Sequence, residues 1–443
     1  MTAYWCELAW LGGDRAEAGV LVEVEAGLIA AVSAGTSAPA SGARRLEGLT
    51  LPGLANAHSH AFQRALRGRT QHGSGSFWTW REQMYRVAER LDPESYHALA
   101  RATYAEMALA GVTAVGEFHY LHHGRGGKPY GDANEMGRAL ITAAAEAGVR
   151  ITLIDSCYLH GGIGEPPDGA QRRFSDGSAD AWAERVDALR EGGSVRIGAA
   201  IHSMRAVDPD AAAVVADWAR ERDRPLHAHV SEQPAENHAC LAAYGHTPTG
   251  LLSEAGALEA RFTAVHATHL DDSDRSLLGG AGACCCVCPT TERDLADGIG
   301  LMSRLAQAGA SLSLGSDSHA VIDLFEEARA VELDERLASG ERGRHTAAAL
   351  LRAASEGGHA CLGWPDAGRI EVGARADLVT VSLGGVRLAG TEPENALDSV
   401  VFAAGAADVR HVLVDGREIV SDGRHATIDV ARELHEAVLA ATA

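Results

Sequence analysis

Histidine and acidic residues occur in short clusters along this chain, each directly after an apolar run. His58 and His60 follow the first run, and because they are two residues apart on a strand both imidazoles face the same way. Two adjacent imidazoles make half of a typical zinc site, which a third imidazole and a carboxylate would complete. Later clusters offer such groups: Glu117 and His119, His202 and Arg205, His229 and Glu232, His266 and His269, and Asp317 and His319. A lone histidine is usually a core or surface residue, but the whole set favours a metal centre.

Eight apolar, strand-like runs carry or precede these clusters and alternate with longer helical patterns. The runs are residues 50–57, 112–118, 149–156, 195–201, 225–230, 262–267, 283–287 and 310–315. Asp92-Pro93 and Asp208-Pro209 each read as a helix start, with aspartate as N-cap and proline in the first turn, and residues 133–147 and 179–190 have helical spacing. Eight strands each followed by a helix predict a (β/α)8 TIM barrel, whose active site lies at the carboxyl ends of the strands. The alternative is a doubly wound open sheet, but its usual glycine fingerprint is missing after the first run.

Both ends of the chain carry short β-like runs instead of this alternation. They are residues 20–24 and 28–32 near the start, and 376–381, 400–402 and 409–414 near the end. We therefore expect an α/β protein with two domains. Residues 51–367 would form the metal-dependent catalytic barrel, and residues 1–50 and 368–443 a small β-sandwich-like domain.

Composition and charge exclude several classes of function. Sixty acidic residues against thirty-nine basic ones give a net charge of −21, which disfavours nucleic acid and anionic membranes as partners. The first residues lack the basic region of a signal peptide, no apolar run has the length of a membrane span, and eight cysteines are too sparse for a disulfide scaffold. A cytoplasmic protein is expected. The single lysine, Lys128, stands in a glycine-rich stretch typical of a loop.

Several stretches resemble the motifs of the amidohydrolase superfamily. They are residues 52–60, 229–232, 265–269, 315–317 and 368–378, so the resemblance spans nearly the whole chain. The combination of H-x-H, H-x-x-E and a late aspartate is specific for the deaminase branch. The resemblance implies one Zn²⁺ per subunit, which lowers the pKa of water so that hydroxide forms near neutral pH. Its implied ligands are His58, His60, His229 and Asp317. Members with two metals often use a carboxylated strand lysine, and the absence of one here favours a single metal.

Longer stretches resemble one subfamily of deiminases, which hydrolyse the linear amidine N-formimidoyl-L-glutamate in histidine degradation. They are residues 60–65, 77–85, 114–123 and 202–207. The resemblance implies N-formyl-L-glutamate and ammonia as products, and a homodimer as the assembly. It implies three catalytic residues: Glu232 as proton shuttle, His266 as the group that orients the attacking water, and Asp317. It also implies that the dicarboxylate substrate is bound by Gln63, Arg81, Tyr120, His202 and Arg205, with the arginines on the carboxylates.

Two other functions stay open at this point. A deaminase of an aromatic ring amine or of another amidine would need no pair of carboxylate-binding arginines. A non-catalytic assembly protein of the same fold would be expected to lose the metal ligands, and this chain keeps four candidates.

The remaining histidines, the cysteine run and a pair of tryptophans are assigned to places outside the metal centre. We predict that His119, His122 and His123 belong to a strand end and a glycine-rich loop rather than to a second metal site. The cysteines of 284–288 are expected in a core strand with alternating faces, and Trp78 and Trp80 of the 64–90 insertion either contact substrate or form a packed lid. Glu292 and Asp294 receive no role.

Overall fold

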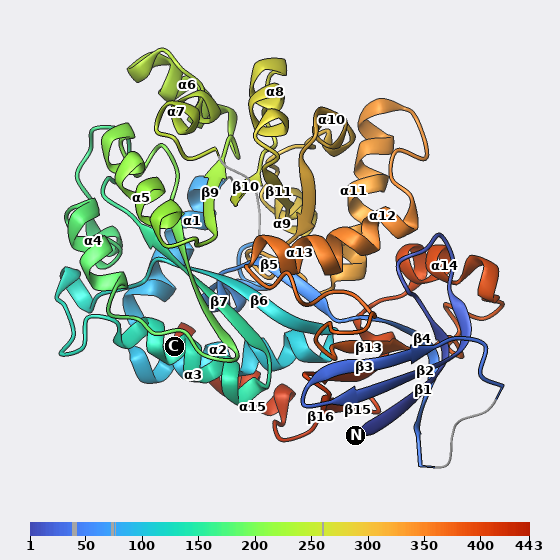
Figure 1. The fold of residues 1–443 in the computed structure, drawn as a ribbon. Coiled ribbons are helices and arrows are strands. Elements are labelled where there is room, and N and C mark those ends of the chain that lie inside the picture. The colour runs from blue at the N-terminus through green and yellow to red at the C-terminus, as the bar shows by residue number, and fades with distance from the viewer. Residues whose placement is uncertain (38–41, 72–74, 76, 259–260) are drawn as a thin grey trace.

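The computed structural model contains two eight-stranded sheets and describes residues 1–443 except 38–41, 72–74, 76 and 259–260 (Figure 1). The first sheet is parallel and runs in chain order. Its strands are β5 (Leu54–Ser59), β6 (Val112–His119), β7 (Arg150–Cys157), β8 (Val195–Ile201), β9 (Leu226–Val230), β10 (Phe262–His266), β11 (Cys284–Val287) and β12 (Ser311–Leu314). Each of the eight predicted runs therefore contributes to this sheet.

The two edge strands of the parallel sheet meet, which closes it into a barrel. Ser59 and Asp317 form a parallel bridge, and the Asp317 amide donates to the His58 carbonyl over 3.0 Å. Asn56 donates from Nδ2 to the Ser316 hydroxyl over 2.7 Å across the same seam. This closure brings the beginning and the end of the barrel sequence into contact, as the metal prediction requires.

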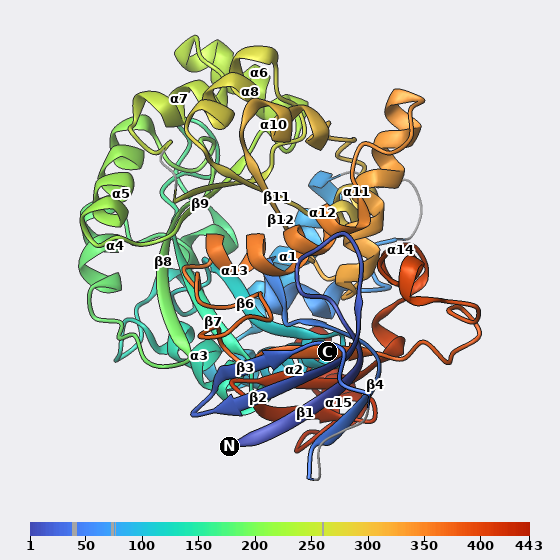
Figure 2. The ribbon, with the colours of Figure 1, turned by 45° about the vertical axis from the view of Figure 1, so that its right-hand side comes forward.

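Helices surround the barrel, as Figure 2 shows. They are α1 (Phe77–Arg90), α2 (Pro93–Leu109), α3 (Glu135–Ala147), α4 (Ala179–Val186), α5 (Pro209–Glu221), α6 (Pro234–Tyr244), α7 (Pro248–Glu254), α8 (Asp272–Gly280), α9 (Pro289–Asp294), α10 (Met302–Ala308), α11 (Leu324–Ser339), α12 (Ala347–Arg352) and α13 (Gly358–Cys361). Short turns of helix are η1 (Ala61–Leu66), η2 (Arg125–Gly127), η3 (Gly169–Arg173) and the π-helical η4 (Ala353–Gly357). Among the described residues, none of the helices combines the length and apolar character that a membrane crossing requires.

The predicted helix starts are confirmed by their capping geometry. Asp92 accepts from the Ser95 amide over 2.9 Å, and Asp208 accepts from the Ala211 amide over 3.0 Å, so each aspartate satisfies a free amide of the first turn. Helix α3 ends at Gly148, whose φ of +78° suits a residue without Cβ.

The second sheet is mixed and joins the two ends of the chain (Figure 1). Its order is β16 (Arg424–His425), β15 (Arg417–Ser421), β14 (Val409–Val414), β13 (Leu378–Val381), β4 (Arg44–Pro52), β1 (Thr2–Ala9), β2 (Glu17–Glu25) and β3 (Leu28–Ser33). The remaining elements near the C-terminus are η5 (Pro393–Asn395), α14 (Ala396–Ala403), η6 (Ala406–Asp408) and α15 (Val430–Thr442), which packs against α2.

Two details differ from the sequence predictions. The run 400–402 belongs to helix α14, which buries Leu397, Val400 and Val401, because three apolar residues fit a helical stripe as well as a strand. The run 50–57 divides between the two sheets at Gly53, where a Cβ would lie 2.3 Å from the Thr113 hydroxyl oxygen. Only a glycine fits this crossing.

Candidate active site

Four predicted metal-binding side chains converge at the carboxyl ends of the barrel strands. His58 and His60 come from β5 and the residue after it, His229 from β9, and Asp317 from the segment after β12. Asp317 Oδ1 lies 3.3 Å from Nε2 of both His58 and His60, and His229 Nε2 lies 3.2 Å from His58 Nε2. All four side chains are buried, and one ligand atom of each lies within 4.8 Å of the others.

Hydrogen bonds fix the tautomer of two of these imidazoles. His60 donates from Nδ1 to the Phe118 carbonyl over 2.9 Å, and His229 donates from Nδ1 to the His202 carbonyl over 2.8 Å. A carbonyl only accepts, so Nε2 of each ring keeps its lone pair and points at the cluster. Such carbonyl partners are typical of histidines that bind metal. Converging lone pairs beside a carboxylate repel one another without a cation, so this donor set fits a divalent metal.

Burial keeps these groups in metal-binding protonation states. Burial and the neighbouring His58 ring lower the pKa of His60 to about 3, and burial with the adjacent imidazoles holds the pKa of His229 well below its usual range. Burial opposes ionisation of Asp317, but its hydrogen bond with His58 and the nearby imidazoles bring the pKa of this carboxyl below its ordinary value. Neutral imidazoles and an ionised carboxylate are the forms that bind metal ions.

Glu232, His266 and Glu292 form a second group beside the four. Glu232 Oε1 lies 3.8 Å from His266 Nε2, which also lies 3.9 Å from Asp317 Oδ2. On the other side of the ring, His266 Nδ1 lies 3.3 Å from Glu292 Oε1, which also accepts from the Cys288 amide over 2.9 Å. Burial disfavours the charged imidazole, but the Glu232 carboxylate and the hydrogen bond to Glu292 raise the pKa of His266 well above its usual value.

Glu292 is a site residue that received no role from the sequence. The available signal was its place just after the seventh apolar run, in the first turn of α9, where a barrel strand ends. Its contact with His266 depends on how two loops meet, which no local pattern encodes.

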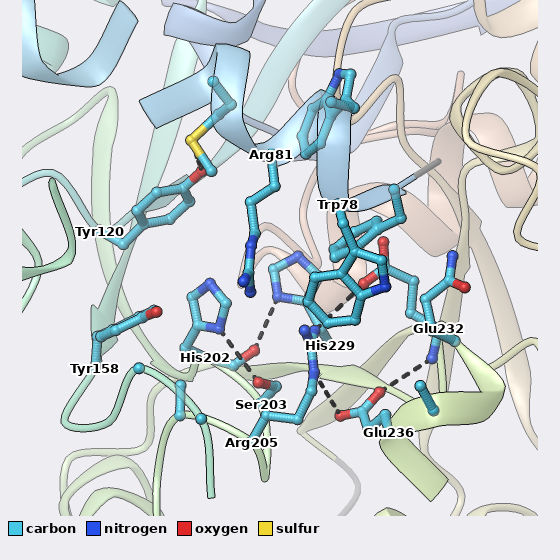
Figure 3. A pocket seen from close by; sticks show the side chains of 18 of the residues that line it. Trp78, Arg81, Tyr120, Tyr158, His202, Ser203, Arg205, His229, Glu232 and Glu236 are labelled. Carbon is cyan, nitrogen blue, oxygen red and sulfur yellow. Dashed lines mark hydrogen bonds and ion pairs between the residues drawn. The ribbon is translucent and has the colours of Figure 1, made fainter. Parts of the chain in front are cut away.

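All five predicted substrate-binding residues line one cavity of about 240 Å³, together with Glu232, His266 and Asp317 (Figure 3). Gln63 from η1 donates to the Tyr120 hydroxyl over 2.9 Å, which fixes both side chains in the wall. The His202 ring lies beside Ser203, with Nδ1 and Oγ 3.3 Å apart. The five residues are Gln63, Arg81, Tyr120, His202 and Arg205.

The two arginines point toward one another across this cavity (Figure 3) but have different surroundings. Arg205 is held by carboxylates: Nη2 lies 3.5 Å from Glu232 Oε2, and Nε lies 3.6 Å from Glu236 Oε1. Arg81 instead lies against aromatic rings, with Cζ 4.5 Å from the Trp78 ring centroid, and forms no ion pair with the described residues. The guanidinium of Arg81 is thus available to an anionic ligand, while that of Arg205 is oriented in advance.

Glu236 is the second residue that the sequence analysis missed. It lies four positions after Glu232 on α6, and it accepts from the Glu232 amide over 3.2 Å. Burial raises the pKa of Glu236, and the charge of Arg205 opposes that shift. Glu236 therefore contacts both the arginine and the backbone of the predicted proton shuttle.

The additional histidines near β6 belong to a buried network behind this site. His119 ends β6, and His122 and His123 lie in the following loop, as predicted. His119 and His122 come close enough to Asp155 to share an ion, but Arg185 already binds both oxygens of that carboxylate, over 2.9 and 2.7 Å. A second cation beside this guanidinium would be repelled, so the network is structural.

Comparison with known proteins defines the class of this chain. The sequence model described as "Amidohydrolase family" matches residues 49–419. The chain is 40% identical over 403 residues to the formimidoylglutamate deiminase of Pseudomonas aeruginosa, covering 88% of each chain. It is 31% identical over 404 residues to the 5-methylthioadenosine/S-adenosylhomocysteine deaminase of Natronomonas pharaonis, covering 90% of this chain and 88% of the relative. The crystal structure of an amidohydrolase from Brucella melitensis superposes over the full length of both chains, with a TM-score of 0.93 and 34% identity.

The chain belongs to the amidohydrolase family. It is therefore a hydrolase that acts on carbon–nitrogen bonds, built on a (β/α)8 barrel. Within the family, the two named relatives are a deiminase of formimidoylglutamate and a deaminase of 5-methylthioadenosine and S-adenosylhomocysteine.

Proposed function

We propose that this protein is a hydrolytic deiminase that converts N-formimidoyl-L-glutamate and water into N-formyl-L-glutamate and ammonia. The observation that carries the proposal is the pair of arginines, Arg81 and Arg205, in the same cavity as the metal-binding cluster. A substrate with two carboxylates is matched by two guanidinium groups, which bind carboxylates through paired hydrogen bonds. The 40% identity to the formimidoylglutamate deiminase of Pseudomonas aeruginosa supports the same substrate.

We infer that His58, His60, His229 and Asp317 hold one Zn²⁺ per subunit. The fit rests on the lone pairs that converge there and on the carbonyl partners behind His60 and His229. A zinc ion bound by these residues would lower the pKa of a water molecule so that hydroxide is available near neutral pH. Asp317 also faces His266, so its carboxylate contributes to the catalytic group as well as to the metal site.

Proton transfer is assigned to Glu232. Its carboxylate faces both His266 and the cavity, within reach of an attacking water and of the substrate nitrogen. As the oxygen of water bonds to the formimidoyl carbon, the double bond from that carbon to the terminal nitrogen becomes a single bond, and Glu232 takes up a proton from the water and passes it to that nitrogen. Glu232 then carries the remaining hydroxyl proton to the same nitrogen, the carbon–nitrogen bond breaks as the formyl C=O bond forms, and ammonia leaves. His266 orients the attacking water and stabilises the charge that develops on the oxygen of the tetrahedral intermediate, and Glu292 fixes the direction of its ring.

The remaining wall residues position the substrate. Arg205, oriented by Glu236, binds one carboxylate close to the reacting group, and Arg81 binds the other from α1. Gln63, Tyr120 and His202 supply polar contacts around the amidine. The reacting carbon is thereby held near Glu232 and His266, which converts binding energy into orientation.

The alternative proposal is a ring deaminase, which the 31% identity to the Natronomonas pharaonis enzyme supports. Two arginines in the cavity count against it, because 5-methylthioadenosine carries no carboxylate and S-adenosylhomocysteine carries only one. A purely structural role is disfavoured because the four candidate metal ligands lie within 4.8 Å of one another.

A substrate panel tests the proposal. Zinc-loaded protein is assayed for ammonia release with N-formimidoyl-L-glutamate, with N-formimidoylglycine, which has one carboxylate, and with 5′-methylthioadenosine. We expect kcat/KM to be highest for the dicarboxylate and at least about 10-fold lower for the glycine analogue, since one charged hydrogen-bonding site is lost. Faster turnover of the nucleoside would overturn the proposal and support the alternative.

Three further statements remain predictions from the sequence. They are a homodimeric assembly, a cytoplasmic location and a place in histidine degradation. The first can be checked by sedimentation of the purified chain at several concentrations.

A further inference from the structure

A second cavity, about 1,050 Å³ in volume, lies at the amino-terminal ends of the barrel strands, opposite the candidate active site. Its wall includes the starts of β11 and β12, the π-helical η4 and the end of α13, which lies between the barrel and the terminal sheet (Figures 1 and 2). Two of the eight cysteines line this cavity: Cys284, the first residue of β11, and Cys361, the last residue of α13. Nothing in the proposed deiminase mechanism uses them.

The two thiols lie next to each other around one hydroxyl group. Ser313 Oγ lies 3.2 Å from Cys284 Sγ and 3.6 Å from Cys361 Sγ. Cys361 Sγ also donates to the Gly358 carbonyl over 3.2 Å. Cys284 is buried and Cys361 is partly exposed, so a small solute in the cavity can approach the pair. Two sulfurs from separate elements thus meet at the wall of the cavity, with Cys361 the more exposed of the two.

The pair is also chemically asymmetric. The neighbouring Cys361 thiol lowers the pKa of Cys284 against the effect of burial, and Ser313 adds to the lowering. The neighbouring Cys284 sulfur and burial raise the pKa of Cys361 well above its usual value. A thiol with a lowered pKa beside one with a raised pKa is the arrangement in which one sulfur reacts with an oxidant and the other displaces the product.

The other cysteines lack this combination. Burial raises the pKa values of Cys6, Cys157, Cys240 and Cys285, and none of the four lines the cavity. Cys286 and Cys288 form a second close pair, but both are fully buried inside the barrel. Selective oxidation is therefore expected at Cys284 rather than along the whole cysteine run.

We propose that Cys284 and Cys361 form a reversible disulfide when the protein meets a hydroperoxide. The Cys284 thiolate attacks one peroxide oxygen, the O–O bond breaks, and Cys284 becomes a sulfenic acid while hydroxide, or alkoxide from an organic peroxide, leaves. The Cys361 sulfur then attacks the Cys284 sulfur, the S–OH bond breaks, and water leaves with the Cys361 proton. Two thiols are oxidised by two electrons, and the peroxide is reduced. The new bond joins β11 to α13 at the end of the barrel remote from the active site.

Mass spectrometry of the full zinc-loaded chain tests the proposal without reference to activity. Reduced protein is treated with one equivalent of hydrogen peroxide, denatured with a thiol-blocking reagent and digested with trypsin. Cys284 lies in the peptide 276–293 and Cys361 in the peptide 353–369. We expect these peptides joined, with the loss of two hydrogens, and we expect titratable thiols to fall from eight to six. Dithiothreitol should restore all eight.

Variants identify the sulfurs, because the first peptide holds four cysteines. Cys284→Ser should abolish the cross-link, and the matched control Cys285→Ser should retain it. In Cys361→Ser, a sulfenic-acid trapping reagent should label Cys284 instead. Loss of thiols without the joined peptides, or a cross-link that survives in Cys284→Ser, would overturn the proposal. If a serine variant fails to fold, the trapping reagent applied to the unmodified chain at early times gives the same assignment.

Discussion

Replacing Arg81 with methionine separates substrate binding from folding. The Arg81 side chain lies on α1 at the cavity wall and stacks on Trp78, with Cζ 4.5 Å from the ring centroid. It forms no ion pair within the described part of the chain, so its removal leaves no buried carboxylate without a partner. Cζ also lies 5.6 Å from the Tyr85 ring centroid, and each of the two lost cation–π contacts is worth about 0.5–1 kcal/mol at a partly exposed position. We therefore expect Arg81→Met to lower the free energy of unfolding by about 1–2 kcal/mol.

The expected loss in catalysis is larger. A hydrogen bond to a charged partner contributes about 1.5–3 kcal/mol, and the partly open setting of Arg81 places its interaction near the middle, at about 2 kcal/mol. That free energy corresponds to a fall of roughly 30-fold in kcat/KM for N-formimidoyl-L-glutamate. Because the carboxylate assigned to Arg81 is the one farther from the reacting carbon, most of the change in kcat/KM should be a rise in KM.

Initial rates of ammonia release measure this effect, with Arg86→Met as the matched control. Arg86 lies on the same helix, is exposed, and contacts Gln83 with Nη1 and Oε1 3.2 Å apart. The control should keep kcat/KM within about 2-fold, the usual range for surface substitutions. A change smaller than about 3-fold in Arg81→Met, or an equal loss in the control, would refute a direct contact between Arg81 and the substrate.

Three further substitutions test the buried ionic contacts. Glu292→Gln should lower kcat by about 10–100-fold with a smaller change in KM, because the substitution weakens the contact that orients the His266 ring. Steady-state kinetics of ammonia release check both values. Arg205→Met should reduce the free energy of unfolding by about 3–5 kcal/mol in a denaturant titration, because it leaves two buried carboxylates unpaired; a cost equal to that of the Arg81 variant would contradict the ion pairs. Asp155→Asn should cost a similar amount of about 3–5 kcal/mol by removing the carboxylate bound to Arg185. Burial raises the pKa of Asp155, but Arg185 outweighs burial and lowers this pKa below 3.8. The stability that the Asp155–Arg185 pair contributes is therefore present above pH 3.8 and is lost as the pH falls through the pKa of folded Asp155. Acid titrations that compare the unfolding of the unmodified protein with that of Asp155→Asn check this loss.

The barrel could be predicted because its strands are buried on both faces. Such strands appear as continuous apolar runs, and the helices between them carry local capping signals at Asp92 and Asp208. The strand-like prediction for 400–402 is wrong because three apolar residues do not distinguish a strand from a helical stripe. The split of 50–57 at Gly53 depends on a close approach to Thr113, which is distant in the sequence.

The convergence of His58, His60, His229 and Asp317 could be predicted because each of them stands at the end of an apolar run, where a barrel places its functional residues. Glu292 and Glu236 could not be predicted in the same way. Their roles depend on contacts with His266 and Arg205, which other loops bring into place. The pairing of Cys284 with Cys361 is likewise a product of the fold, since α13 lies far along the chain from β11.

The most direct test of the proposed function is ammonia release from N-formimidoyl-L-glutamate, measured on metal-free protein, on protein reloaded with one equivalent of zinc, and on reloaded protein treated with a chelator. The account predicts turnover only in the reloaded protein, with N-formyl-L-glutamate as the second product and loss of turnover on chelation. Equal turnover in metal-free protein would contradict the assignment of His58, His60, His229 and Asp317 to a catalytic metal. No turnover in protein shown to hold one zinc would contradict the assigned substrate.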